Sequence, residues 1–272
     1  MPELPDIVVL ARSMDQALRG QSIAELTVNQ PKCLNRPEAE LRATIVGRQL
    51  ASIVQRGKWV IVALSDGSSL ALNLGMGGEV RIHGSDEVAG PARERVTWRL
   101  GDGRQLWAHF WWFGSVHYAA PGELVKHPQI GALGPEPLAP DFTIEALAGM
   151  LTGRRGAIKS YLLDQKLIAG IGNVYVQDTL FRAHLHPLRQ AGTISPEGVA
   201  RLHWAIRETL AEGIRWGGGP SEQDVWGNVG TYSDHFLVGY HTGQPCPECG
   251  MVVEQIRTGS TTSYICPKCQ QL

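Results

Sequence analysis

The chain has 272 residues, enough for one large domain or two ordinary ones with hydrophobic cores, so its folding does not require disulfides. Its apolar share of 43% and charged share of 19% are ordinary for globular proteins, and its apolar runs are shorter than the ~20 residues of a membrane span. The formal net charge of -1 argues against a uniformly basic nucleic-acid binder and leaves only a local basic surface for that role. Because the first residues lack the basic and apolar regions of a signal peptide, we expect a cytoplasmic protein without a membrane role.

The first part of the chain predicts a helix followed by strands. Apolar residues recur at helical spacing from Pro5 to Leu18, and Gly20 supplies a stop. From about residue 22 to residue 119 the pattern changes to short β-rich runs, such as Trp59 to Leu64, which are separated by glycine-containing turns. We therefore expect an amphipathic helix that leads into an antiparallel β-sandwich or barrel.

The second part predicts helices. A Pro/Gly stretch at residues 133–138 marks a domain boundary, and the segment from there to about Trp216 has a helical pattern. Ser195, Pro196 and Glu197 give an N-cap, a first-turn proline and a first-turn acid, and glycines 217–219 end this last long helix. The sequence therefore predicts an α+β fold with domains at residues 2–132, 133–231 and 236–272.

Two cysteine pairs near the end of the chain have the spacing of a zinc site. Cys246 and Cys249 form one CxxC pair, Cys266 and Cys269 form another, and sixteen residues separate the two pairs. This pattern is typical of a four-cysteine structural zinc site, in which the metal has no open position for catalysis. The alternative of two disulfides suits a secreted chain. The fifth cysteine, Cys33, is expected to be a small buried apolar residue.

A glycine-rich turn lies between two expected helices. Gly170-Ile171-Gly172-Asn173 follows an apolar helical segment at residues 158–167 and precedes another that begins near Val174. Glycines at the start of a helix let backbone N–H groups approach an anion, and the helix dipole favours a phosphate there. A Gly-x-Gly turn also serves simply to separate two helices.

The wider string around this turn resembles a known DNA-repair family. It reads Ala157-Ile158-Lys159-x-x-Leu162-Leu163-Asp164-Gln165-x-x-Ile168-Ala169-Gly170-Ile171-Gly172-Asn173-x-Tyr175. It closely resembles the helix-two-turn-helix of the formamidopyrimidine-DNA glycosylase (Fpg) and endonuclease VIII (Nei) family, and favours the Fpg branch. Further blocks match in order and spacing: Pro2-Glu3-Leu4-Pro5, Gly57-Lys58, Leu74-Gly75-Met76, residues 133–138 and the four-cysteine ribbon. The resemblance spans essentially the whole chain.

This resemblance implies a covalent mechanism. Removal of Met1 exposes the secondary amine of Pro2, and an α-amine with a pKa of about 8 is a usable nucleophile near neutral pH. In the family, that amine attacks the deoxyribose C1′ of a flipped-out nucleotide, expels the base and forms a Schiff base that leads to strand elimination. Glu3 matches the family's acid/base residue, and Lys58 matches its active-site lysine. By themselves, a Pro-Glu start is equally a helix cap, and a lone lysine in a strand is usually solvated.

The resemblance also implies DNA contacts, several of which are altered. Lys159, Gly172 and Asn173 match residues near the damage and the phosphates. Met76 and Phe113 match two of the three side chains that fill the gap left by base flipping, but Trp111 replaces the third, an arginine. Thr261 replaces an arginine of the ribbon that grips phosphate, and Arg257 is a candidate substitute.

Three further features of the aromatic run and the loops bear on core packing and on the preferred lesion. Trp112 is expected to pack into the sandwich core. Asn73 stands where Fpg proteins usually have a histidine that contacts phosphate, and the loop at 219–230 departs from the family's lesion-capping loop. These changes argue against 8-oxoguanine as the preferred substrate.

Three hypotheses remain open at this point. The leading one is a bifunctional DNA glycosylase and abasic-site lyase with an altered lesion range. It would act as a monomer, in the cytoplasm at the nucleoid, on double-stranded DNA that holds a damaged base or an abasic site. The second is a non-catalytic paralogue that binds damaged DNA, which would have no need of Pro2 and Glu3. The third is a zinc-ribbon protein for RNA or protein partners, which leaves the N-terminal block unexplained.

Overall fold

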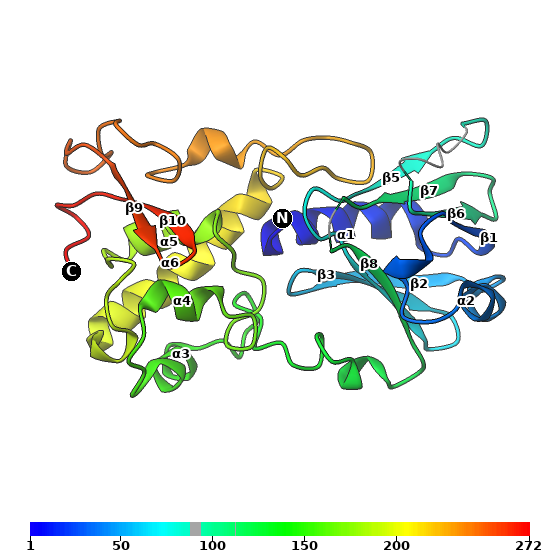
Figure 1. Ribbon diagram of the computed structural model, residues 1–272, viewed down its shortest axis with the longest axis horizontal. Helices are drawn as coiled ribbons and strands as arrows, with labels where there is room; N and C mark the ends of the chain where they lie inside the picture. The colour runs from blue at the N-terminus through cyan, green and yellow to red at the C-terminus, as the bar shows by residue number, and fades with distance from the viewer. Residues whose placement is uncertain (88–93, 112) are drawn as a thin grey trace. The chain divides into compact units, whose positions relative to one another are not determined.

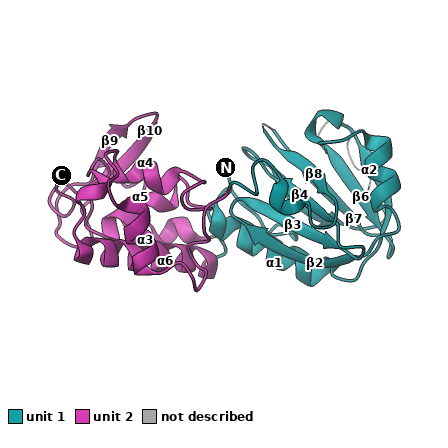
Figure 2. Ribbon diagram, turned by 90° about the horizontal axis from the view of Figure 1, so that it is seen from below, with its two compact units in different colours: residues 1–132, 217–230 teal, residues 133–216, 231–272 magenta. Residues whose placement is uncertain are grey.

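The structure is a computed structural model that describes residues 1–87, 94–111 and 113–272. The chain divides into two compact units (Figure 2): unit 1 comprises residues 1–132 and 217–230, and unit 2 comprises residues 133–216 and 231–272. Residues 217–230, which the sequence analysis grouped with the helical segment, thus fold with the first unit. Trp112 lies outside the described residues. Within the described part of the chain, every helix is too short or too polar to cross a bilayer.

Unit 1 begins with α1 (Leu4–Leu18), which packs against strands β2 (Leu50–Arg56) and β3 (Trp59–Leu64) (Figure 1). Its apolar face is fully buried, with Ile7, Leu10 and Met14 each no more than 2% exposed. Each such side chain contributes roughly 1.5–3 kcal/mol of burial. At the helix start, the Glu3 backbone N–H donates to Asp6 Oδ2 at 2.7 Å, half of a reciprocal capping box that satisfies otherwise unpaired amides. The predicted helix is confirmed, one residue longer at its start.

Two antiparallel four-stranded sheets form the rest of unit 1, with strand orders β1-β6-β7-β5 and β2-β3-β4-β8. Their strands are β1 (Ile23–Val28), β2 (Leu50–Arg56), β3 (Trp59–Leu64), β4 (Ser69–Asn73), β5 (Glu79–His83), β6 (Val96–Leu100), β7 (Gln105–His109) and β8 (Ser115–Ala119). Side chains from both sheets and α1 share one apolar core, which includes Leu72, Trp98 and Leu106. A short helix, α2 (Glu38–Ile45), was not predicted because it buries only two apolar residues.

Unit 2 contains the helices α3 (Ile144–Leu151), α4 (Ile158–Leu163), α5 (Tyr175–Arg182) and α6 (Pro196–Arg215). The predicted cap of α6 is confirmed: Ser195 Oγ accepts a hydrogen bond from the Gly198 backbone N–H at 3.2 Å. The expected helix at 158–167 is shorter, because Asp164 Oδ1 accepts from the Lys166 N–H at 2.9 Å and closes a turn. The predicted α+β fold is confirmed.

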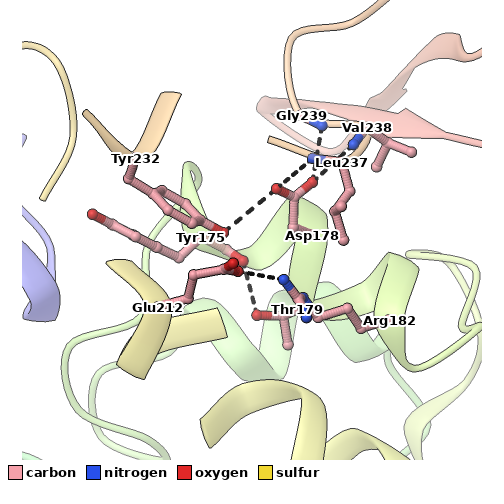
Figure 3. A network of polar contacts seen from close by, with 9 residues as sticks. All are labelled: Tyr175, Asp178, Thr179, Arg182, Glu212, Tyr232, Leu237, Val238 and Gly239. Carbon is pink, nitrogen blue, oxygen red and sulfur yellow. Dashed lines mark hydrogen bonds and ion pairs between the residues drawn. The ribbon is translucent and has the colours of Figure 1, made fainter. Parts of the chain in front are cut away.

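A buried carboxylate ties the start of the ribbon to α5. Asp178 accepts hydrogen bonds of 3.0 Å from the backbone N–H groups of Leu237, Val238 and Gly239 (Figure 3). Three amide donors balance a negative charge that would otherwise be costly to bury. The ribbon hairpin follows, with strands β9 (Glu254–Thr258) and β10 (Thr261–Ile265) paired in antiparallel register. The hairpin is thereby held on the helices of unit 2.

Candidate functional site

In unit 1 the start of the chain lies at a small polar pocket. Pro2 and Glu3 are buried at the N-terminus of α1, and Pro2 lines a cavity of about 50 Å³ together with Asp6, Glu79 and Glu222. Glu3 and Asp6 are only 3% and 7% exposed. An amine at this position therefore has several carboxylates as its neighbours.

Lys58 is the predicted cation that this unit brings toward the same carboxylates. It lies in the tight turn between β2 and β3, directly after Gly57, whose φ of 54° is readily adopted by glycine. Burial lowers the pKa of Lys58, while the charges of Glu3 and Asp6 act in the opposite direction. An ammonium in such a setting gives up a proton more readily than an exposed lysine, so Lys58 is suited to contact an anion or to exchange a proton.

Asn73, which replaces a histidine of the family pattern, supports this turn. Its Nδ2 donates to the Lys58 carbonyl at 3.3 Å, and its Oδ1 accepts from the Gly75 N–H at 2.9 Å. In this structure Asn73 therefore holds the backbone of Lys58 in place.

Glu222 is a site residue that sequence reasoning missed. Its carboxylate lies 3.9 Å from the terminal amine of Met1, and its side chain is 14% exposed. Burial raises the pKa of Glu222 to about 7, the charges of Asp6 and Glu3 add to this, and the terminal amine opposes it. No local motif marks Glu222, because a loop far along the chain carries it to the N-terminus.

Three large apolar side chains of unit 1 are exposed, as a DNA-inserting group would be. Met76, Trp111 and Phe113 are 49%, 62% and 82% exposed, and Phe113 has a φ of 59°, which is strained for a residue other than glycine. The Trp111 indole packs against Gly77, where a Cβ would approach it within 3.1 Å, and it stands edge-on to His109 at 4.7 Å. Trp111 thus lies against the turn that follows Met76. Exposed apolar side chains mark a binding surface when they form one contiguous patch.

In unit 2, Lys159 is buried under the hairpin. It is 2% exposed, and its Nζ donates to Thr258 Oγ1 at 3.2 Å, to the Thr262 carbonyl at 2.6 Å and to Ser263 Oγ at 2.8 Å. These bonds use all three N–H groups of the ammonium. Burial lowers the pKa of Lys159 to about 8. The side chain therefore fastens α4 to the hairpin in this structure.

The predicted phosphate-binding turn is rigid. Gly170 adopts a φ of 92°, and Gln165 spans the turn by accepting from the Gly170 N–H and donating to the Ile171 carbonyl, both at 2.8 Å. Gly172 is buried, and the Asn173 carbonyl accepts from Gln177 Nε2 at 2.7 Å. These hydrogen bonds within the chain hold the start of α5.

At the hairpin tip the two candidate DNA contacts differ in charge. Arg257 is exposed, and its Nε donates to the Gly259 carbonyl at 3.2 Å. Thr261 Oγ1 donates to the Thr258 carbonyl at 3.1 Å, so its hydroxyl is engaged within the turn. Arg257 is the charged group that this hairpin presents to solvent near its tip.

The four ribbon cysteines form the metal centre. Their sulfur atoms all lie within 4.8 Å of one another, with 3.4 Å between Cys249 and Cys266 and 3.9 Å between Cys246 and Cys269. A tetrahedral zinc with Zn–S bonds of about 2.3 Å requires sulfurs about 3.8 Å apart. All four thiols are free of disulfides, so this site binds one structural zinc ion. Cys33 is buried as expected, which raises the pKa of its thiol to about 11.

Comparison with family models assigns both units to one class, the DNA-repair glycosylases. The formamidopyrimidine-DNA glycosylase N-terminal domain matches residues 1–123, the H2TH domain of the same enzyme matches 133–224, and the zinc finger found in Fpg and IleRS matches 243–272. The formamidopyrimidine-DNA glycosylase of Chloroflexus aurantiacus is 38% identical, over 99% of this chain and 98% of the relative. That of Gluconobacter oxydans is 37% identical over the full length of both chains. The chain belongs to the formamidopyrimidine-DNA glycosylase family.

Solved structures agree with this assignment. Lactococcus lactis Fpg in complex with DNA containing an abasic site superposes with a TM-score of 0.93 at 27% identity, covering 99% of this chain and 100% of that one. The Fpg protein (MutM) of Thermus thermophilus gives a TM-score of 0.88 at 32% identity, covering 99% and 98%.

Proposed function

We propose that this protein is a base-excision repair glycosylase that removes damaged bases through a Schiff base on Pro2, and that its lyase activity then cleaves the strand. The observation that carries the proposal is the buried Pro2-Glu3 start of α1 at a polar pocket, beside a lysine whose pKa is lowered. A non-catalytic DNA binder would have no reason to bury this cluster of ionisable groups, because burying charges is unfavourable unless they are used or paired.

In the proposed reaction, removal of Met1 makes Pro2 the terminal secondary amine. Its lone pair attacks C1′ of the damaged nucleotide, and the glycosidic bond breaks with its electron pair on the departing base. Glu3 relays the remaining N–H proton of the bonded Pro2 to the ring oxygen as the C1′–O bond of the sugar breaks, which leaves an iminium between Pro2 and C1′. Elimination of one flanking phosphate, or of both, then cleaves the strand. Lys58 is assigned to contact the phosphate and lesion.

The proposed partner is double-stranded DNA with a damaged base or an abasic site, bound by a monomer at the nucleoid. Fpg of Lactococcus lactis binds such DNA in its solved complexes, which supports the assignment. Here Met76, Trp111 and Phe113 would fill the gap left by the flipped nucleotide, because unstacking costs a few kcal/mol unless the space is filled. In this scheme residues 2–132 carry the nucleophile Pro2 together with Glu3 and Lys58.

The remaining proposed contacts come from the other two ranges. The helix-two-turn-helix range 133–231 would contribute Lys159, Gly172 and Asn173, and the hairpin range 236–272 would contribute Arg257 and Thr261. Backbone amides at a helix start and a neighbouring guanidinium both favour phosphate oxygens. The buried position of Lys159 supports an indirect role in DNA binding, in which its side chain holds the hairpin that carries Arg257.

Borohydride trapping on a duplex with one abasic site tests the proposal. Reduction of the imine should leave a covalent protein–DNA adduct whose modified peptide begins at Pro2. A Pro2→Gly variant keeps an α-amine and is expected to retain reduced trapping, whereas an uncleaved N-terminal tag should abolish it. Adduct formation by the tagged protein would refute the assignment to Pro2. Tight binding of the abasic duplex without any adduct would favour the non-catalytic alternative.

A further inference from the structure

The loop 219–230 is built so that it presents one carboxylate to the start of the chain. Two side chains of α1 hold its backbone: Asp6 Oδ1 accepts from the Gly219 N–H at 2.8 Å, and Ser13 Oγ accepts from the Val225 N–H at 3.0 Å. Gly218 has a φ of 89° and lies so close to Asp6 that an added Cβ would come within 2.6 Å of its carboxylate. The loop is therefore fixed directly to the helix that begins at the proposed nucleophile.

A second set of contacts fixes the middle of the loop to the sheet. Arg81 of β5 donates to Gln223 Oε1 at 2.5 Å, and the Ile82 N–H donates to the Val225 carbonyl at 2.9 Å. Between these anchors, Glu222 lies 3.9 Å from the terminal amine and shares the wall of the small pocket with Pro2. Removal of Met1 moves the amine by at most about 3.8 Å, the spacing of adjacent residues, along that wall.

The groups that face Glu222 set its proton affinity. Glu3 and Asp6 of α1 and Glu79 of β5 are acidic, while the terminal amine and Lys58, which lies near Glu3 and Asp6, are basic. The pKa of Glu222, raised to about 7, lies close to the value of about 8 for an ordinary α-amine. Proton transfer between groups with similar proton affinities is close to balanced, which suits a catalytic acid/base pair.

We propose that Glu222 is a further catalytic residue, which takes the proton from the Pro2 ammonium before attack on C1′. This inference rests on the proposed function. The ammonium gives one proton to the carboxylate, leaving a neutral amine and a carboxylic acid. The amine lone pair then forms the bond to C1′, and the acid returns the proton to the group that departs, which is the base during excision or the hydroxyl, as water, on an abasic sugar.

Single-turnover cleavage of an abasic duplex between pH 5.5 and 9 tests the inference with Glu222→Gln. Without the carboxylate, the amine must lose its proton to water, so the rate at pH 6.5 should fall at least about tenfold, a modest part of the 10²–10⁴ typical of general-base loss. The midpoint of the pH–rate profile should move up toward about 8, and the two proteins should converge near pH 9, where the amine is already neutral.

Two variants complete the experiment. Glu222→Asp keeps a carboxylate and should retain the wild-type profile at a lower rate, while Glu123→Gln removes an exposed carboxylate elsewhere on unit 1 and should behave as wild type. Coincident profiles for wild type and Glu222→Gln, or a loss that is independent of pH, would overturn the inference while leaving the proposed function intact. Failure of the wild-type chain to form a trapped adduct would instead refute the proposed function itself.

Discussion

Lys159→Met tests how the buried ammonium beneath the hairpin changes the free energy of unfolding. Lys159 is 2% exposed, and burial lowers its pKa from 10.5 to about 8. At 1.36 kcal/mol per pKa unit, the charged form is therefore destabilised by about 3 kcal/mol relative to the unfolded chain. Methionine removes this cost and fills similar space. The partners stay satisfied, because Thr258 Oγ1 and Ser263 Oγ lie 2.9 Å apart and the Thr262 carbonyl still accepts from Gln177.

The sign of the pH dependence follows from which state holds the proton. Between about pH 8 and pH 10.5 the unfolded chain keeps the Lys159 proton and the folded chain has released it. Stability therefore rises with pH in this window, by at most about 1.4 kcal/mol per pH unit. The Met variant has no such group. The free energy of unfolding of wild type minus that of Lys159→Met should thus increase by about 3 kcal/mol from pH 7.5 to pH 10.5.

Calorimetry at matched zinc concentrations measures this difference, with the transition that responds to zinc chelation assigned to unit 2. Other titrating groups cancel in the subtraction. Lys126→Met is the control, because Lys126 is 71% exposed and the Glu123 carboxylate raises its pKa, so it stays mostly charged in both states up to about pH 9.5 and can only lower stability as the pH approaches 10.5. Parallel stability curves for wild type and Lys159→Met would refute the argument that burial lowers the pKa of Lys159.

Three other changes give distinct outcomes. Chelation of the zinc, or Cys249→Ser, should release one zinc ion per chain and weaken binding of an abasic duplex, while borohydride trapping at saturating protein should remain. Retained metal in Cys249→Ser would contradict the four-cysteine site. Trp111→Arg should supply paired hydrogen-bond donors to the base opposite the flipped nucleotide, and so raise the single-turnover rate of 8-oxoguanine excision opposite cytosine. Efficient, cytosine-dependent excision by the wild-type protein would show that Trp111 is a harmless replacement. Thr261→Arg should tighten binding and steepen log Kd against log salt by about 0.9, and an unchanged slope would place the added guanidinium away from phosphate.

The elements that were predicted correctly are those whose signals are local. The start of α6 follows from Ser195 and Pro196, because a cap and a first-turn proline act within one helical turn. The metal centre follows from the spacing of two CxxC pairs, because each pair closes a tight turn onto the same ion. By contrast α2 has a weak apolar pattern, and the end of α4 is set by an Asp164 turn that competes with a continued helix.

The missed residue Glu222 and the enclosure of Lys159 both depend on contacts between distant segments. Glu222 reaches the N-terminus only because Gly219 bonds Asp6 across 213 positions in the chain. Lys159 was predicted as a residue near the damage, and its ammonium is enclosed by a hairpin that begins about one hundred residues later, as its bond to Thr258 across 99 positions shows. Periodicity and spacing carry no information about such closures, since each depends on how the whole unit packs.

Asn73 illustrates why a changed residue in a family pattern is not equivalent to a lost function. The family pattern places a phosphate-binding histidine there, whereas here the carboxamide bonds the backbone of Lys58 and Gly75 with both of its polar groups. A histidine offers one donor and one acceptor on opposite sides of a ring, so it would not reproduce this short bridge. The substitution therefore supports the turn that carries Lys58, the cation that we propose to contact the ligand. The same reasoning applies to Lys159, whose charge acts on the hairpin and, through it, on the position of Arg257.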